Sequence, residues 1–269
     1  LIDEGHLARP EFEFVSLSGQ QLGGYNDEYS DVVRKCIELE PTRNTAVARK
    51  AAELAEDGYR VFVSVNRIRQ GKLIEYALSD DISDSQILSE VKRGEQEPKR
   101  QNEVLNAVSN LDCVGDYNVE FLYSNDSTDR RQEVLAAFQE GDIDILVSTL
   151  LKEGVDIPEI TAIVQAEGGK SKIEKLQRIG RALRPDTTRD HAKIVDFEDE
   201  GKYLGDHYDK RVNNLKEYYG AYGPGDGFSE NIEAVRGYLR DQGVEVEACK
   251  LTETDDGGAH GDEQRPPRR

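Results

Sequence analysis

Hydrophobic residues along the chain alternate between short apolar runs and longer stretches with helical spacing. The compact runs predict strands at 12–17, 60–65, 119–123, 143–148, 160–165 and 192–197. Between them, apolar residues recur every three or four positions and predict helices at 25–39, 42–57, 68–78, 128–139, 172–183 and 204–219. Strands that alternate with helices are typical of βαβ units. The pattern therefore predicts one doubly wound α/β domain over residues 12–219, with a mostly parallel sheet and helices on both faces.

Four segments stand apart from this alternation. Residues 79–118 are polar, hold two weakly helical stretches, and predict an insertion into the domain. Residues 220–251 begin with a glycine-rich linker and predict a C-terminal extension with one helix and one strand. Residues 252–269 are acidic and then rich in Pro and Arg, a composition typical of a disordered tail. Residues 1–11, which precede the first strand, are interpreted as a connector between domains.

Composition narrows the class of protein. The chain has 54 Asp and Glu against 35 Lys and Arg, a net charge of −19, and 36% hydrophobic residues, which is enough for a core. No apolar run reaches the roughly 18 residues of a membrane helix and no signal peptide is visible, so we expect a cytoplasmic protein. Three distant cysteines argue against a disulfide framework, and the histidine spacing indicates no metal site. Because the chain begins at Leu1 and contains no Met, we expect a piece of a longer protein.

The first candidate for chemistry is the segment 148–158, which reads Ser-Thr-Leu-Leu-Lys-Glu-Gly-Val-Asp-Ile-Pro. It follows the predicted strand 143–148, and ligands of parallel α/β sheets bind at the carboxyl ends of strands. Gly154 permits a tight backbone turn, and Asp156 can accept a hydrogen bond from a ribose hydroxyl. Taken alone, the segment is more simply an ordinary glycine turn with a solvated carboxylate.

The second candidate is the segment 177–185, which reads Gln-Arg-Ile-Gly-Arg-Ala-Leu-Arg-Pro. On a helix, Gln177, Arg181 and Arg184 are related by i, i+4 and i+7 and share one face. Guanidinium groups make multidentate contacts with phosphate and keep their charge, as an arginine finger requires. The surrounding stretch, 170–193, has a local charge of +5 within a chain of −19. The alternative is a solvated basic face or an internal ion-pair network.

In this order and spacing, the two segments resemble motifs V and VI of superfamily 2 helicases. Residues 166–172, which join them, resemble the phage and archaeal DEAD/DEAH-type branch near the DNA-repair helicases. The stretch 61–71, with Asn66 and Arg67, resembles motif IV. The resemblance extends over about residues 1–219 and implies the C-terminal RecA-like domain of such an enzyme.

The resemblance implies a divided ATP site. A preceding RecA-like domain of the same protein would bind most of ATP and Mg²⁺, and this domain would close over it. Arg181 and Arg184 would stabilise charge on the γ-phosphate, and Gln177 would orient the phosphate and water. The residues implied to line the nucleotide are Gly154, Asp156 and Arg178. The Gly-Lys-Ser at 169–171 echoes a phosphate loop, but the earlier glycine falls at Val164, so the isolated chain is expected to be inactive.

The resemblance also implies contacts with the backbone of one nucleic-acid strand, made by polar residues that follow three predicted strands. The candidates are Asn66, Arg67, Ser124, Asn125, Ser148 and Thr149. DNA is favoured by the branch, and RNA stays open. Two other functions stay open as well. One is the motor of a restriction or repair translocase, and the other is a RecA-like binding module that has lost turnover.

The strong negative charge predicts a protein from a high-salt organism, because acidic surfaces are a device of halophiles. We expect the melting temperature to rise when dilute buffer is exchanged for molar KCl, since salt screens the repulsion among the acidic groups. Circular dichroism melts at both salt concentrations measure this shift. Full stability without salt would favour an ordinary acidic protein instead.

Overall fold

The structure is a computed structural model, and it describes residues 9–17, 19, 23–24, 26–92, 98–150, 160–169 and 191–218. The chain divides into two units, 1–229 and 230–269. The second unit, with most of the expected extension and the tail, lies outside the described residues, so the description concerns the first unit alone. Among the described helices, none is long and apolar enough to cross a membrane.

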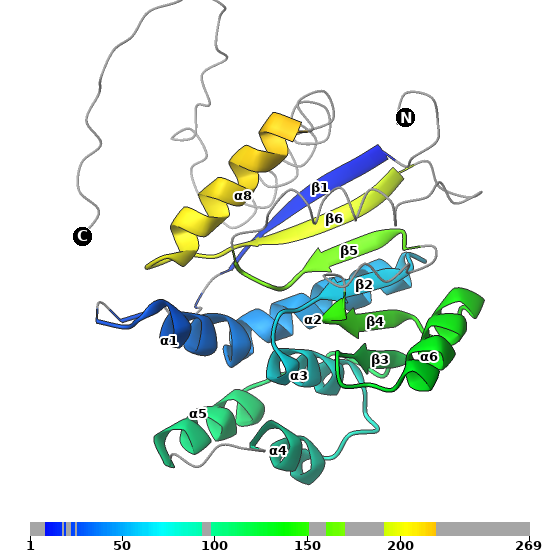
Figure 1. Ribbon diagram of the computed structural model, residues 1–269, viewed down its shortest axis with the longest axis horizontal. Helices are drawn as coiled ribbons and strands as arrows, with labels where there is room; N and C mark the ends of the chain where they lie inside the picture. Colours follow the sequence, from blue (N-terminus) through cyan, green and yellow to red (C-terminus); the bar gives the residue numbers. More distant parts are fainter. Residues whose placement is uncertain are drawn as a thin grey trace, which may run out of the picture. The chain divides into compact units, whose positions relative to one another are not determined.

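Strands and helices alternate along this unit, as the hydrophobic pattern predicts (Figure 1). The strands are β1 (Arg9–Ser16), β2 (Val61–Ser64), β3 (Val119–Leu122), β4 (Ile145–Ser148), β5 (Ala162–Gln165) and β6 (His191–Glu198). The helices are α1 (Tyr29–Val33), the π-helical segment η1 (Arg34–Glu38), α2 (Pro41–Glu56), α3 (Ile68–Leu78), α4 (Asp84–Lys92), α5 (Pro98–Ser109), α6 (Thr128–Glu140) and α8 (Leu204–Tyr218). The predicted helix 172–183 lies outside the described residues.

The six strands form one sheet in the order β1-β6-β5-β2-β4-β3, and all its pairings are parallel. This confirms the predicted doubly wound α/β architecture. The three central strands β2, β4 and β5 are buried along their whole length, because both faces of the sheet are covered. Parallel pairing places the carboxyl ends of all strands at one edge of the sheet, called the carboxyl edge below.

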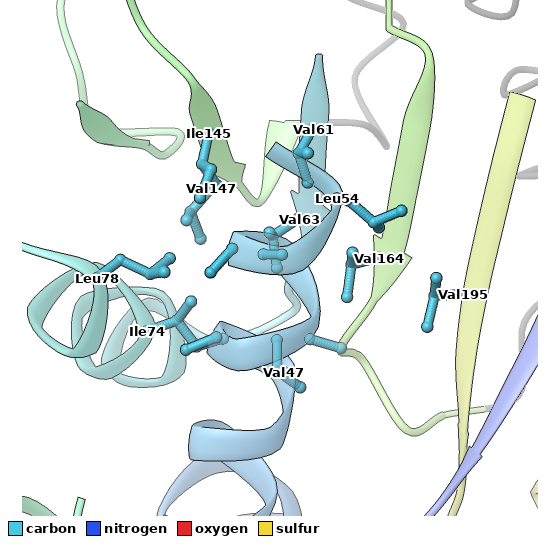
Figure 2. Packing of buried hydrophobic residues seen from close by; sticks show 14 of the residues in the cluster. Val47, Leu54, Val61, Val63, Ile74, Leu78, Ile145, Val147, Val164 and Val195 are labelled. Atoms are coloured by element: carbon cyan, nitrogen blue, oxygen red, sulfur yellow. The ribbon is translucent and has the colours of Figure 1, made fainter. Parts of the chain in front are cut away.

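One face of the sheet packs against α2 and α3 (Figure 2). Apolar residues of α2 spaced three or four apart, such as Val47, Ala51 and Leu54, lie over the strand residues Val63 and Val164. The opposite face carries α6 and α8, which contribute Phe138, Val134 and Leu215 to a second cluster around Phe62 and Leu146. The sheet is therefore the middle of three layers.

The expected insertion, 79–118, holds two helices, α4 and α5, and both belong to the domain's own packing. They form a third apolar cluster with Leu73 of α3 and with Leu39. Ion pairs add to this contact, between Lys72 and Glu90 and between Arg34 and Glu103. The insertion is therefore held on α3 and η1 by buried side chains.

Helix α3 also protects one of the two edge strands of the sheet, β3. The backbone N–H of Phe121 donates a hydrogen bond to Oε1 of Glu75 at 3.1 Å. One turn earlier, Gly71 lies so close to the Phe121 ring that a Cβ would come within 2.3 Å of it. Glu75 thus satisfies a donor of the edge strand that has no strand partner. Burial raises the pKa of this carboxyl to about 7, with the N–H of Phe121 and Lys72 opposing the shift.

We expect Glu75→Gln to stabilise the protein at pH 8 and to change its stability little at pH 4.5. Because the pKa of Glu75 is higher in the folded state, stability falls as pH rises from about 4.5 through about 7, and ionised Glu75 is penalised above that. An amide oxygen still accepts from Phe121 without the charge. Urea unfolding should show a gain of about 1–3 kcal/mol at pH 8. The control is Glu133→Gln on the exposed surface of α6, and an equal gain at both pH values would contradict this assignment.

Candidate functional site

The strands that precede the two candidate segments, β4 and β5, end at the same level of the carboxyl edge. Ser64, at the end of β2, pairs with Ser148 of β4 on one side and with Gln165 of β5 on the other. The segments 151–159 and 170–190 follow these two strands, and both lie outside the described residues. The expected nucleotide contacts in them are Gly154, Asp156, Gln177, Arg178, Arg181 and Arg184. The structure describes the strands that precede these segments, β4 and β5. In the sheet, β2 lies between them.

The connection that leaves β2 and the one that leaves β5 run in opposite directions along the sheet. From β2 the chain passes through α3 to the edge strand β3, whereas from β5 it passes to β6 on the other side. In doubly wound sheets, such a switch point opens a crevice outside the carboxyl ends, and ligands bind there. Asn66 follows β2 and Gly169 follows β5, so these residues border the switch point.

The structure brings the expected nucleic-acid contacts to one edge, after three neighbouring strands. Arg67 is exposed between β2 and α3. Ser124 and Asn125 are exposed in the turn after β3, which is closed by the N–H of Tyr123 donating to Oδ2 of Asp126 at 2.8 Å. These side chains face solvent and are available for hydrogen bonds.

Ser148 and Thr149 differ in their surroundings. The Ser148 hydroxyl is buried, donates to the Leu122 carbonyl at 2.9 Å, and accepts from the Leu150 N–H at 3.0 Å. It therefore holds the ends of β3 and β4 together. Thr149 is partly exposed next to it. Within this pair, Thr149 presents the hydroxyl that a strand could reach.

Asn66 has an unusual environment for a residue in a turn. Its Oδ1 atom is buried and has no hydrogen-bond partner within the described structure. Its Nδ2 atom lies 3.9 Å from the position that a Cβ at Gly169 would occupy, and the Tyr29 hydroxyl lies 3.8 Å from the same position. A buried acceptor without a donor is costly, which makes it a candidate for binding a ligand donor.

The loop 166–169 follows β5 and is held by a buried polar network. It precedes residues 177–185, called the arginine-bearing segment below. Arg43 of α2 is fully buried, donates to the Ala166 carbonyl at 2.8 Å, and pairs with Asp199 at 2.7 Å. Gln70 of α3 donates to the same carbonyl at 2.9 Å. Arg211 of α8 donates to the Gly169 carbonyl at 3.1 Å. We call Arg43, Gln70, Asp196, Asp199 and Arg211 the buried polar network.

The charges within the network compensate one another. Arg211 pairs with Asp196 at 2.7 Å and with Asp199 at 3.2 Å, so Asp199 is shared with Arg43. Burial raises the pKa of Asp196, and the charge of Arg211 opposes that shift. Burial alone would lower the pKa of Arg211, but Asp196 and Asp199 raise it. Two guanidinium groups and two carboxylates thus make a neutral buried unit.

The middle of the loop is equally constrained. Ser64 donates a hydrogen bond to Glu167 across the strand ends. Gly168 has a φ of +61°, and a Cβ there would lie 2.4 Å from Cδ1 of Ile37. Only glycine fits this backbone and this space. The loop 166–169 is therefore held in one conformation up to the last residue that the structure describes before residue 191.

This network is not among the features predicted from the sequence, although the sequence carries a signal of it. Arg43 lies four residues before Val47 on the apolar face of α2, where a charged side chain is unexpected. Likewise, Arg211 shares the buried stripe of α8 with Leu204, His207 and Leu215. A cation on an apolar face indicates a buried partner, but its identity depends on the fold.

Similar proteins support the predicted resemblance to helicases. Residues 99–186 match the helicase conserved C-terminal domain family, a range that includes both candidate segments and the strands that hold them. Over these residues the chain is similar to the C-terminal domain of helicases, as the order of the two segments predicts. A Sulfurisphaera tokodaii protein named DNA 3′-5′ translocase XPB2 is 42% identical to it over 57 residues, and the Saccharomyces cerevisiae protein IRC3 is 31% identical over 81 residues.

The solved structure of T4 UvsW shares the fold of the helicase domain. The two align with a TM-score of 0.50 and 17% identity, over 78% of this chain and 40% of UvsW. Both sequence relatives are much longer than their matched parts, which make up 13% of XPB2 and 12% of IRC3. Within the described residues, no group of three His, Cys, Asp or Glu side chains is placed to hold a metal ion.

We expect Arg211→Met to destabilise the helicase domain by about 3–5 kcal/mol, because it leaves Asp196 buried without its cation. Urea unfolding at pH 7 measures the change. Arg49→Met is the matched control, since Arg49 pairs with Asp112 at 2.7 Å on the surface and both side chains are about 60% exposed. That substitution should cost under about 1 kcal/mol. Equal effects of the two substitutions would show that the network adds no stability.

Proposed function

We propose that this chain is the second motor domain of an ATP-dependent superfamily 2 DNA helicase or translocase. In this role it supplies arginines to ATP bound by a preceding RecA-like domain, and it contacts the backbone of one nucleic-acid strand. The observation that carries the proposal is the register of the sheet. It brings the strands that precede the two motif segments to the same level, on either side of β2.

The nucleotide half of the proposal rests on the segment 177–185 and on the loop before it. The buried polar network fixes Ala166 and Gly169, and the arginine-bearing segment continues from there. An arginine finger must be placed without reorganisation when charge develops on the γ-phosphate. A loop held by three buried side chains suits that requirement. Arg181 and Arg184 are the proposed fingers, and Gln177 the residue that orients the phosphate and water.

The proposed cofactor is ATP with Mg²⁺, bound in a site shared with the preceding domain. The arginines present would neutralise phosphate oxygens, while Gly154, Asp156 and Arg178 would line the nucleotide. In this proposal the preceding RecA-like domain would hold most of the ligands of Mg²⁺. When bound, the nucleotide supplies the phosphoanhydride that is hydrolysed.

The nucleic-acid half rests on the polar residues at the carboxyl edge. Asn66, Arg67, Ser124, Asn125 and Thr149 follow three adjacent strands and can contact phosphates in sequence. Contacts of this type carry no base specificity, as a motor that moves along DNA requires. The name of the XPB2 relative, a DNA translocase, favours DNA as the track.

The test is the ATPase activity of the full-length protein in high KCl, with and without DNA. Arg181→Ala should lower the DNA-stimulated rate by roughly 10³-fold or more, because the developing phosphate charge loses its guanidinium. The control is Arg189→Ala, which removes a charge from the same basic stretch but lies beyond Pro185. Circular dichroism confirms that both variants are folded.

The alternatives give different results. Unchanged hydrolysis in Arg181→Ala would remove this residue from the mechanism. Absence of hydrolysis in the wild-type protein, together with retained DNA binding, would favour a RecA-like module without turnover.

A further inference from the structure

Large hydrophobic side chains are exposed at three positions in the part of the chain that the structure describes. They are Tyr29, Ile68 and Tyr203, which are 42%, 38% and 37% exposed. All three lie at the carboxyl edge, at the starts of α1, α3 and α8 (Figure 1). Elsewhere in the described structure, large apolar side chains are at least partly covered. Exposed apolar groups concentrated at one edge indicate a binding surface.

Tyr29 and Tyr203 form a pair, called the tyrosine pair below. Their ring centroids are 5.8 Å apart and the ring planes are at 89°, an edge-to-face contact. His207 supports Tyr29 from beneath the surface, with centroids 5.2 Å apart, and is buried. The pair therefore has a fixed geometry while more than a third of each side chain remains exposed.

The pair borders the switch point of the sheet. The Tyr29 hydroxyl and Nδ2 of Asn66 lie within 4 Å of the same point, beside the Cα of Gly169. A Cβ at Gly169 would meet both atoms at ordinary van der Waals distance, so the tyrosine and the asparagine flank this glycine. The Oδ1 atom of the same Asn66 side chain is buried and has no hydrogen-bond partner in the described structure.

The backbone of Tyr203 supports a functional role for its ring. Tyr203 has a φ of +66° and is the non-glycine residue with a positive φ in the described structure. Asn or Gly would adopt this conformation at lower cost. Strained backbone that places an exposed aromatic ring at a ligand edge points to a role of the ring in binding.

We propose that the tyrosine pair is a stacking platform for a base of the nucleic-acid strand. It extends the backbone contacts of Asn66 and Arg67 across the switch point, and it therefore rests on the proposed function. Every base has an aromatic face, so stacking on tyrosine holds a strand without reading its sequence.

The local charge suits a base better than a phosphate. Hydrogen bonds from Lys35 and from the Gly24 N–H lower the pKa of Asp27, so Asp27 is ionised close to the pair. Lys35 neutralises it at 2.9 Å. Lys202 lies 4.7 Å from the centroid of the Tyr203 ring and donates to the Asp27 carbonyl at 2.7 Å. Glu28 and Asp206 are also exposed, so the surroundings of the pair carry no net positive charge. Stacking of a base on the rings is therefore the main attraction between the pair and a nucleotide.

The experiment measures binding of the full-length protein to two single strands by fluorescence anisotropy. One is an oligothymidylate and the other has the same backbone with abasic sites. Tyr203→Asn removes the ring and suits the backbone at φ +66°. We expect it to weaken binding to the oligothymidylate about tenfold, which corresponds to one stacked base. It should leave binding to the abasic strand unchanged.

Control variants distinguish an effect of the Tyr203 ring on binding from effects of folding and of charge. Tyr203→Phe keeps the ring and should bind as the wild-type protein does. Tyr117→Leu removes a tyrosine in front of β3, at the opposite edge, and should also have no effect. Tyr29→Leu should reproduce the selective loss. Arg67→Ala should weaken binding to both strands, and its effect should shrink as salt rises.

Two results would overturn the inference. Tyr203→Asn could bind both strands as tightly as the wild-type protein while Arg67→Ala binds weakly, which would leave the proposed function standing without the platform. Equal losses of Tyr203→Asn on both strands would show that the ring supports the fold and does not stack. If neither the wild-type protein nor any variant binds the strands, the nucleic-acid half of the proposed function fails as well.

Discussion

The buried polar network is the constraint on which the carboxyl edge depends. Two arginines and two aspartates are buried together, and desolvating four charges is favourable only when each finds its partner in good geometry. The network joins the strand β6 to α2 and α3 on one face of the sheet and to α8 on the other face. An apolar core of the same volume would hold these elements as well, but it could not donate hydrogen bonds to the carbonyls of Ala166 and Gly169. The cost of burying charge is therefore balanced by a defined loop conformation.

The loop 166–169 is linked to both proposed binding sites, the one for the nucleotide and the one for the nucleic-acid strand. It precedes the arginine-bearing segment in the chain, and Gly169 lies beside Asn66. A change in the position of the loop would therefore affect both proposed sites. Arg43 and Arg211 reach the loop from different helices, so a rigid-body shift of either α2 or α8 would alter a hydrogen bond that holds it. Coupling between a nucleotide and a strand requires such a shared element, with contacts that both ligands can bias.

The hydrophobic pattern was sufficient to predict the strands, most helices and the parallel sheet. The helix expected at 25–39 is shorter: it begins at Tyr29 and widens into the π-helical η1, a change that spacing alone does not reveal. Motif order predicted the family, which the matched domain confirms. The network and the tyrosine pair could not be predicted, because their members are far apart in sequence. Arg43 and Asp199 meet only after β6 has been placed beside β5, and Tyr29 meets Tyr203 across the whole domain. The roles of Arg181 and Arg184 stay predictions.

Charge explains why the carboxyl edge has this composition. A chain of −19 repels phosphate at long range, and in salt that repulsion extends only about 10 Å or less. On the proposed function, a strand must therefore be held by contacts that act over a few ångströms. Hydroxyl and amide groups at Asn66, Ser124, Asn125 and Thr149 act at that range, and so do exposed aromatic rings. Arg67 is the one arginine among these residues. An edge built from neutral groups and rings binds a strand with little dependence on salt, and such an edge is compatible with an acidic surface around it.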